Sequence, residues 1–382
     1  MDDLRDWLWL TLRPGVGPTA QRALLAAFGL PGQVLQAGRS AIRSVVGAEI
    51  ADQLLAPPDT DLVDSALRWC AEPGNHILTL ADPGYPQSLL DIPDPPVLIY
   101  VKGDPSVLGR SALAVVGARS ATPQGVANAS AFARSLADSG LAIVSGLALG
   151  IDTAAHQGAL ESASGTTIAV IGTGADRVYP ARNKTLAHQI VTRGAIVSEF
   201  PLGTAPLRHN FPRRNRIIAG LARGVLVVEA AVGSGSLITA RLATDSGREV
   251  FAIPGSIHSP LARGCHRLIR DGAKLVETAE DVLEELRWGG NATVPEPDDR
   301  TRAKPSMRTG HEGRTGISEA RPAQSPTGEG ARLLELIGYD PVDIDTLAAR
   351  SGLTLDALYA ILLPLELDGH ISRMPGGRFQ RL

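Results

Sequence analysis

Residues 112–253 alternate short apolar runs, rich in valine and isoleucine, with longer segments of helical periodicity. The runs expected to form strands are 112–116, 141–145, 167–171, 195–198, 225–229 and 250–253. Polar and apolar residues do not alternate within these runs, so both faces of each strand should be covered. The pattern therefore predicts an α/β fold, a doubly wound parallel sheet with helices on both faces.

Amphipathic segments between the runs predict the helices 123–139, 153–161, 184–192, 212–222, 236–246 and 261–270. Thr122, Asp152 and Asn183 precede three of these segments and are suited to cap their first turns. Ligands of doubly wound sheets bind where the strands end. The residues that directly follow the strands are therefore the candidates for a binding pocket.

The run 211–221, FPRRNRIIAGL, concentrates positive charge at the expected start of a helix. Arg213, Arg214 and Arg216 lie in it and Arg208 lies just before it, although the whole chain has a formal net charge of −3. Such a block needs either a polyanion or buried acidic partners, and the sequence leaves both open. The free amides of a first helical turn would add affinity for an anion.

Several strand ends bring further donors to the same rim of the sheet. Arg119 follows the first strand and Lys184 begins a helix, so both could join the arginines of the run in one basic pocket. The side chains expected there are those of Arg119, Lys184, Arg208, Arg214 and Arg216. The backbone amides of Gly146 and Ser236 are expected to contact phosphate as well.

The glycines do not form a dinucleotide-binding motif. Segment 117–125 lacks a complete G-x-G-x-x-G, and the pair of glycines at 172–174 is followed by Pro180 before any helix. Segment 233–236, GSGS, opens a helix with small donor-rich residues and is the better anion-binding candidate. No nucleotide cofactor is expected.

Catalytic groups are scarce near the strand ends. His156 and Glu229 are the titratable residues to consider, and neither has a nucleophile or metal partner at a diagnostic spacing. A structural role is the preferred interpretation for His156. No catalytic residue and no metal site are predicted.

The first 75 residues should form a small helical domain of the helix-hairpin-helix type. Segment 7–29 contains two helical stretches around the turn 14–18, with Thr19 as the expected N-cap, and 41–55 and 62–71 are further helical patterns. A Gly-x-Gly turn of this kind can meet a DNA phosphate. A plain corner between two helices is favoured instead, because few basic residues are close by.

The tail is expected to contain a linker and a second small domain. Residues 289–330 are rich in proline, glycine and charge and predict a disordered linker. Residues 331–382 contain the helical patterns 331–337, 343–350 and 355–367, followed by a wing that turns at 375–377. This order of elements predicts a winged helix.

The third helix of the expected winged helix is acidic. It carries Asp356 and Glu366, with Asp368 at its end, and no lysine or arginine, so a DNA groove would repel it. The wing is basic through its arginines, among them Arg373 and Arg378. A contact with a protein partner or a regulatory role is favoured over reading of bases.

The composition bears on the cellular compartment of the protein and on how it could bind nucleic acid. Cys70 and Cys265 are the only cysteines and lack the spacing of a metal site. The acidic start does not resemble a signal peptide, and no apolar run is long enough to span a bilayer. We expect a soluble cytoplasmic protein. Aromatic residues make up only 4% of the chain, so phosphate contacts should carry much of any affinity for nucleic acid.

A set of motifs across residues 80–288 resembles the DNA-processing protein A (DprA/Smf) family. The motifs are 116–119 (VGAR), 145–152 (SGLALGID), 179–180 with Asn183, 198–201 (SEFP), 211–221 and 264–269 (GCHRLI). The resemblance implies an extended Rossmann-like domain at residues 76–288 without enzymatic activity. It further implies a protein that binds single-stranded DNA, forms a homodimer and loads the recombinase RecA during natural transformation.

The resemblance also assigns roles to single residues. Its DNA pocket corresponds to Arg119, Lys184, Arg208, Arg214 and Arg216, with Asn215 inside the most diagnostic motif. The family's dimerising helix corresponds to 265–270, which makes His266, Leu268 and Ile269 candidates for the two-fold contact. Plain core packing is the alternative for Leu268 and Ile269.

Two other functions remain open from the sequence. Nucleoside-monophosphate phosphoribohydrolases resemble the same sheet, but they carry a glutamate where this chain places Thr239. An interaction adaptor whose main partner is a protein is the other alternative, motivated by the acidic third helix of the tail.

Overall fold

The computed structural model describes residues 2–56, 59–288, 328–374 and 376–381. They divide into two compact units, Met1–Leu286 and Arg287–Leu382. The predicted linker 289–330 lies outside the described residues except for its last three positions, so its expected disorder stays a prediction.

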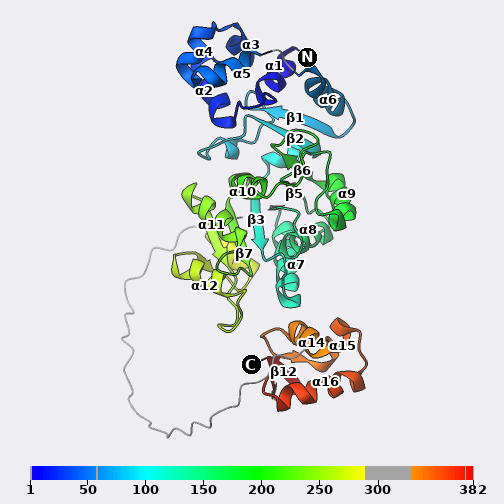
Figure 1. Ribbon diagram of the computed structural model, residues 1–382. Coiled ribbons are helices and arrows are strands. Elements are labelled where there is room, and N and C mark those ends of the chain that lie inside the picture. Colours follow the sequence, from blue (N-terminus) through cyan, green and yellow to red (C-terminus); the bar gives the residue numbers. More distant parts are fainter. Residues whose placement is uncertain (1, 57–58, 289–327, 375, 382) are drawn as a thin grey trace, which may run out of the picture. The chain divides into compact units, whose positions relative to one another are not determined.

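The first unit is built on a nine-stranded sheet with the order β1-β2-β6-β5-β4-β3-β7-β8-β9 (Figure 1). From β6 to β9 in this order, every two neighbouring strands are parallel to each other. They are β3 Ala112–Gly117, β4 Ala142–Ser145, β5 Thr167–Val170, β6 Ala195–Ser198, β7 Gly224–Val228, β8 Glu249–Ala252 and β9 Lys274–Leu275. The predicted doubly wound α/β fold is confirmed.

Two antiparallel strands, β1 (Asn75–Thr79) and β2 (Leu98–Gly103), extend the sheet beyond β6. Between them Tyr85 is buried and donates its hydroxyl to the carbonyl oxygen of Pro96 at 2.7 Å. The proline-rich segment 80–97 between these strands, which we call the connector, therefore packs against the core of the sheet.

The helices of this sheet are α7 Pro123–Asp138, α8 Ile151–Glu161, α9 Lys184–Arg193, α10 Asn210–Leu221, α11 Gly235–Asp245, α12 Arg263–Arg270 and α13 Ala279–Glu285. Strand β5 shows why both sheet faces are covered: Ile168 and Val170 lie in the core with α10, and Ala169 lies in the core with α9. Successive side chains of a strand point to opposite faces, so an unbroken apolar run requires two cores.

The cap predicted for α8 is wrong and the cap predicted for α7 is confirmed. Helix α8 begins at Ile151 with Gly150 as its N-cap, so Asp152 lies inside the first turn. Gly150 adopts a φ of 78°, a conformation that favours glycine. Thr122 does cap α7, since its hydroxyl accepts from the Gly125 amide at 3.0 Å.

The chain order of the strands creates a switch point beside β3. The chain runs outward from β3 through β4, β5 and β6, returns to β7 on the other side of β3 and continues through β8 to β9. Loops that follow neighbouring strands on the two sides of such a point diverge and leave a crevice. This crevice is where a ligand site is expected.

The N-terminal helices are α1 Asp2–Thr11, α2 Pro18–Phe28, α3 Pro31–Gln36, α4 Arg39–Val46, α5 Ala48–Leu55 and α6 Thr60–Cys70. Thr19 lies inside α2 rather than at its cap, because the helix begins at Pro18. Helices α1 and α6 lie against β1 and β2 (Figure 1). The rings of Trp69 in α6 and Tyr100 in β2 meet edge to face there, with their centroids 5.7 Å apart. The helical domain therefore shares a core with the sheet.

The second unit is the predicted winged helix. Its helices are α14 Glu329–Ile337, α15 Ile344–Ser351 and α16 Leu355–Leu367, and its sheet has the order β10-β12-β11. The strands are β10 Val342–Asp343, β11 Ile371–Met374 and β12 Arg378–Arg381.

In the described part of the chain no single helix is long and apolar enough to cross a membrane. The bent pair of α15 and α16 passes this test of length and composition only when the two helices are taken together.

Candidate nucleic-acid interface

A cavity of about 720 Å³ opens at the switch point, between the loops after β3 and β4, helix α10 and the first turn of α11. The predicted residues that line it are Arg119, Arg208, Arg214, Asn215 and Ser236. Arg119 and Arg208 are exposed, whereas Arg214 and Asn215 are buried at its wall. The cavity therefore combines exposed cationic side chains at its rim with a buried charge at its wall.

Arg214 is held by the protein on several sides. Its Nη1 donates to the carbonyl oxygen of Gly146 at 2.7 Å and also to that of Val170, and its Nε donates to Oδ1 of Asn215 at 3.0 Å. Burial lowers the pKa of Arg214 to about 10, and the charge of Asp152 opposes that shift. The guanidinium stays cationic at neutral pH and supplies positive potential from a fixed position.

Gly146 lies beneath Arg214 rather than on the cavity lining. A Cβ atom on Gly146 would come within 2.2 Å of the Arg214 guanidinium nitrogens, so only glycine leaves room for this arginine. The contact that the structure shows for Gly146 uses its carbonyl oxygen. Its predicted amide contact with phosphate stays a prediction.

Two buried titratable groups, Asp152 and His156, interact with the charge of Arg214. Burial raises the pKa of Asp152, whose carboxylate accepts from the Ala148 amide at 3.2 Å. Burial and the Arg214 charge lower the pKa of His156 to about 3. The His156 Nδ1 lies 2.7 Å from the Thr167 hydroxyl, which itself donates to Ile143, so this nitrogen is the donor of a neutral ring.

Glu229 has a structural role in the described residues. Its carboxylate accepts from the Thr122 amide at 2.9 Å and from the Thr122 hydroxyl at the start of α7. Negative charge stabilises a helix N-terminus. The backbone of Glu229 adopts a φ of 57°, which is unusual for a residue other than glycine and turns the chain sharply after β7.

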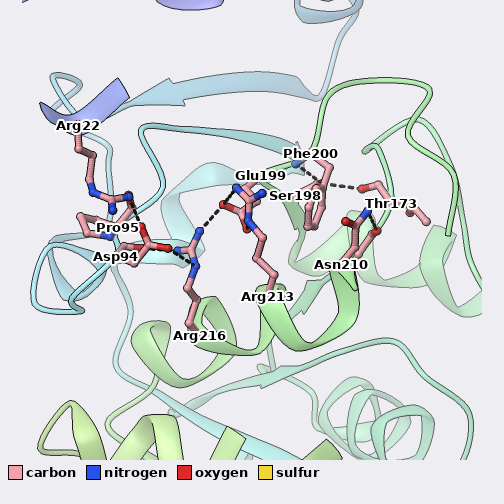
Figure 2. A network of polar contacts seen from close by, with 11 residues as sticks. Arg22, Asp94, Pro95, Thr173, Ser198, Glu199, Phe200, Asn210, Arg213 and Arg216 are labelled. Carbon is pink, nitrogen blue, oxygen red and sulfur yellow. Dashed lines mark hydrogen bonds and ion pairs between the residues drawn. The ribbon is translucent and has the colours of Figure 1, made fainter. Parts of the chain in front are cut away.

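Arg216 does not share the cavity with Arg214. Figure 2 shows Arg216 reaching from α10 to Glu199 and to Asp94, and Arg216 is absent from the described lining of the cavity. Glu199 also forms an ion pair with Arg213, whose Nε lies 3.1 Å from the Glu199 Oε1, and Asp94 pairs with Arg22 of α2. The expectation of one pocket containing all five basic residues is therefore corrected for Arg216, whose partners are the buried carboxylate of Glu199 and the partly exposed carboxylate of Asp94.

Helical geometry explains this separation. Residues two positions apart on a helix lie on roughly opposite faces, whereas residues three apart share one. Arg213 and Arg216 consequently both reach Glu199, and Arg214 points away from them. Lys184 is exposed at the start of α9 and is likewise absent from the described lining of the cavity.

An aromatic pair at the mouth of the cavity was missed by the sequence reasoning. The rings of Tyr179 and Phe211 lie 5.8 Å apart, and the Arg119 guanidinium lies 5.5 Å from the centre of the Phe211 ring. Tyr179 is 46% exposed. Both residues stand in motifs that the sequence analysis noted, but 32 positions separate them and only the fold brings them together.

The predicted dimer residues lie on and around α12. A ring nitrogen of His266 lies 3.0 Å from the carbonyl oxygen of Gly255, and Leu268 and Ile269 are partly buried against the central core. Core packing thus uses part of both apolar side chains. The exposed face of the helix carries arginines instead: Arg263, Arg267 and Arg270.

Comparison with known proteins gives consistent matches. Residues 76–287 match a family model described as DNA recombination-mediator protein A, and residues 318–377 match a DprA winged helix domain. Protein Smf of Escherichia coli is 40% identical over 316 residues, which are 82% of this chain and 80% of that protein.

Two solved structures are similar as well. DNA processing protein A of Streptococcus pneumoniae has a TM-score of 0.66 and 39% identity over 73% of this chain and 97% of that one. The Helicobacter pylori protein, solved to describe its single-stranded DNA binding mode, has a TM-score of 0.50 and 30% identity over 55% of this chain and 95% of that one.

Proposed function

Because this chain belongs to the DNA recombination-mediator protein A (DprA/Smf) family, we propose that it binds single-stranded DNA in the cavity at the switch point and acts as a recombination mediator. The arrangement of Arg119, Phe211 and Tyr179 carries this proposal. A strand offers both bases that stack on aromatic rings and phosphates that pair with guanidinium groups. The binding of single-stranded DNA by the H. pylori relative supports the proposal.

The cavity has the parts that such a ligand needs. Phe211 and Tyr179 would receive a base, while Arg119 and Arg208 at the rim would contact the neighbouring phosphates. The first turn of α11, with Ser236, would add amides to the phosphate contacts. Lys184 lies outside the described lining, so we assign it at most a contact farther along the strand.

We assign no catalytic step to the protein. Asp152 is the single carboxyl among the described residues that line the cavity, and its pKa is raised by burial. Thr239 lines the cavity at the position where phosphoribohydrolases carry a glutamate. Incubation with nucleoside monophosphates checks this assignment: no free base should appear, and release of base would instead support the enzyme alternative.

We further propose that the protein forms a homodimer through the region of α12. The strand β9 is the last in the sheet order and leaves Leu275 exposed, and Ile257 nearby in sequence is exposed as well. A two-fold contact including His266 would cover these apolar side chains and place two DNA cavities in one particle. Sedimentation velocity of the full chain should then show a dimer that Leu275→Arg converts to a monomer.

The recombinase that receives the strand is proposed to be RecA, in the cytoplasm and during natural transformation. The description of the family as a recombination mediator supports this role. A RecA loading assay on single-stranded DNA coated with a competing binding protein tests it. The chain should shorten the lag of RecA assembly, and an unchanged lag would contradict the role.

A gel-shift series tests the DNA-binding proposal itself. We expect a 20-nucleotide single strand to bind much more tightly than a duplex of the same sequence, because paired bases cannot reach the Phe211 ring. Equal affinity for the two would leave only a general attraction to phosphate and would contradict the proposed site.

A further inference from the structure

Helix α16 of the winged helix exposes an apolar stripe. Its members, Leu355, Tyr359, Leu363 and Leu367, recur every four residues and are 47%, 46%, 58% and 78% exposed. Side chains four residues apart lie next to one another on a helix surface. They therefore form one continuous surface, which we call the α16 stripe.

The core of the winged helix is built from the opposite side of α16. Leu358, Leu362 and Leu365 on the other side of the helix are buried among α14, α15 and the small sheet. A helix that is apolar on both faces is typical of a helix that is covered on both faces. A continuous exposed surface of four large apolar side chains marks a site where another molecule docks.

Charge at the two ends of the helix restricts what can dock. Asp356 lies in the first turn of α16, Glu366 lies in its last turn, and Asp368 follows at its C-cap. The helix contains no lysine or arginine. DNA phosphates would be repelled. A second copy of the helix would bring acids against acids in either the parallel or the antiparallel direction, which disfavours self-association.

We propose that the α16 stripe is the docking surface for a cationic amphipathic helix of a partner protein. The partner would present apolar side chains at helical spacing and a lysine or arginine near each end of the contact. The acids of α16 are ten to twelve residues apart, so the matching bases should lie about 15–18 Å apart at the rise of an α-helix.

Tyr359 fixes the centre of the surface. Its ring meets the buried ring of Phe379 in β12 edge to face at 6.5 Å. A docking surface with a rigid centre costs less conformational entropy on binding. The proposal concerns the second unit alone and does not depend on the DNA cavity of the first.

The test uses the full chain and a fluorescein-labelled 18-residue peptide of leucine and lysine, with leucines on one helical face. A peptide with glutamate in place of lysine is the matched control. We expect the lysine peptide to bind at least tenfold more tightly than the glutamate peptide. The double substitution Leu363→Ser with Leu367→Ser should weaken its binding at least tenfold without changing any charge.

Control variants separate the stripe from general apolar surface. Leu30→Ser with Leu62→Ser removes two exposed leucines from the first unit and should leave peptide affinity unchanged. Equal affinity for the two peptides, or unchanged affinity after the Leu363 and Leu367 substitutions, would overturn the proposal. It would also be overturned if those substitutions abolished self-association, duplex binding or binding to phosphatidylcholine vesicles instead of peptide binding.

Discussion

Arg214 and Arg216 stand two positions apart on α10 and have opposite surroundings: Arg214 donates to the Gly146 carbonyl at 2.7 Å, whereas Arg216 pairs with the carboxylate of Glu199. One face of the helix thus forms a wall of the cavity at the switch point, and the other face anchors the helix to the loop after β6 and to the connector before β2. We infer that the Arg216 side is structural and that the Arg214 side sets the electrostatics of the cavity.

Replacement of Glu199 should therefore affect stability more than binding. The Glu199 side chain is 3% exposed and is shared by Arg213 and Arg216, so Glu199→Gln removes the more buried of the two carboxylates that pair with Arg216 and leaves only Asp94. Removal of one partner of a buried ion pair should lower the free energy of unfolding by about 3 kcal/mol. Urea unfolding measures this change.

The matched control is Glu285→Gln, which removes a more exposed carboxylate that pairs with Lys274. This control substitution should lower the free energy of unfolding by less than about 1 kcal/mol. A double-mutant cycle should also give a larger coupling of Glu199 to Arg216 than to Arg213, whose side chain is 39% exposed. Equal losses of unfolding free energy in Glu199→Gln and Glu285→Gln would show that the ion pairs of Glu199 do not anchor α10.

His156 should make the fold sensitive to acid. Its pKa is about 3 in the folded chain, against 6.5 as its ordinary value, so between these values only the unfolded chain binds the proton. Stability should then fall with decreasing pH below about 6.5, by up to about 1.4 kcal/mol per pH unit.

A comparison with His156→Gln isolates this effect from other groups. Asp152 has a raised pKa, and its protonation acts in the opposite direction as the pH falls. The difference in unfolding free energy between the two proteins should shrink as the pH is lowered from 7 to 4. Parallel pH curves would show that the ring titrates normally in the folded chain.

The Phe211 ring should contribute to binding through stacking. Phe211→Leu keeps an apolar side chain but removes the ring that lies beside Tyr179 and under Arg119. Loss of one stacked base costs about 1–3 kcal/mol, which corresponds to a weakening of about fivefold to 150-fold. Titration of a labelled single strand measures this, with Phe28→Leu in α2 as the matched control. Affinity that is the same in both variants would exclude a stacking role.

Much of the fold followed from local patterns in the sequence. Unbroken apolar runs predicted the parallel strands because a strand covered on both faces has no polar side, as Ile168 and Ala169 show in their separate cores. Strand β9 was missed because its two residues, Lys274 and Leu275, are both exposed and form no apolar run. The sequence pattern detects burial, so an exposed edge strand escapes it.

The site was harder to predict because it depends on distant partners. The opposite orientations of Arg214 and Arg216 could have been read from helical spacing alone. The acids that hold Arg216 could not, because Glu199 is 17 residues away and Asp94 is 122. The pairing of Tyr179 with Phe211 likewise requires the loop after β5 and the start of α10 to be in place.

The central claim is that exposed arginines at the rim of the cavity hold the phosphates of a single strand. Fluorescence anisotropy of a labelled 20-nucleotide thymidine oligomer, titrated at several salt concentrations, tests it most directly. The variant to compare is Arg119→Ala with Arg208→Ala, and the control is Arg241→Ala, an exposed arginine of α11 that pairs with Asp245.

Binding to the wild-type chain should weaken steeply with salt, because each phosphate contact on a single strand contributes about −0.7 to the slope of log affinity against log salt. The double variant should bind at least tenfold more weakly at low salt, with a slope shallower by about 1.4 for two lost contacts. The Arg241→Ala chain should match the wild type. A double variant with the affinity and slope of that control would contradict the account.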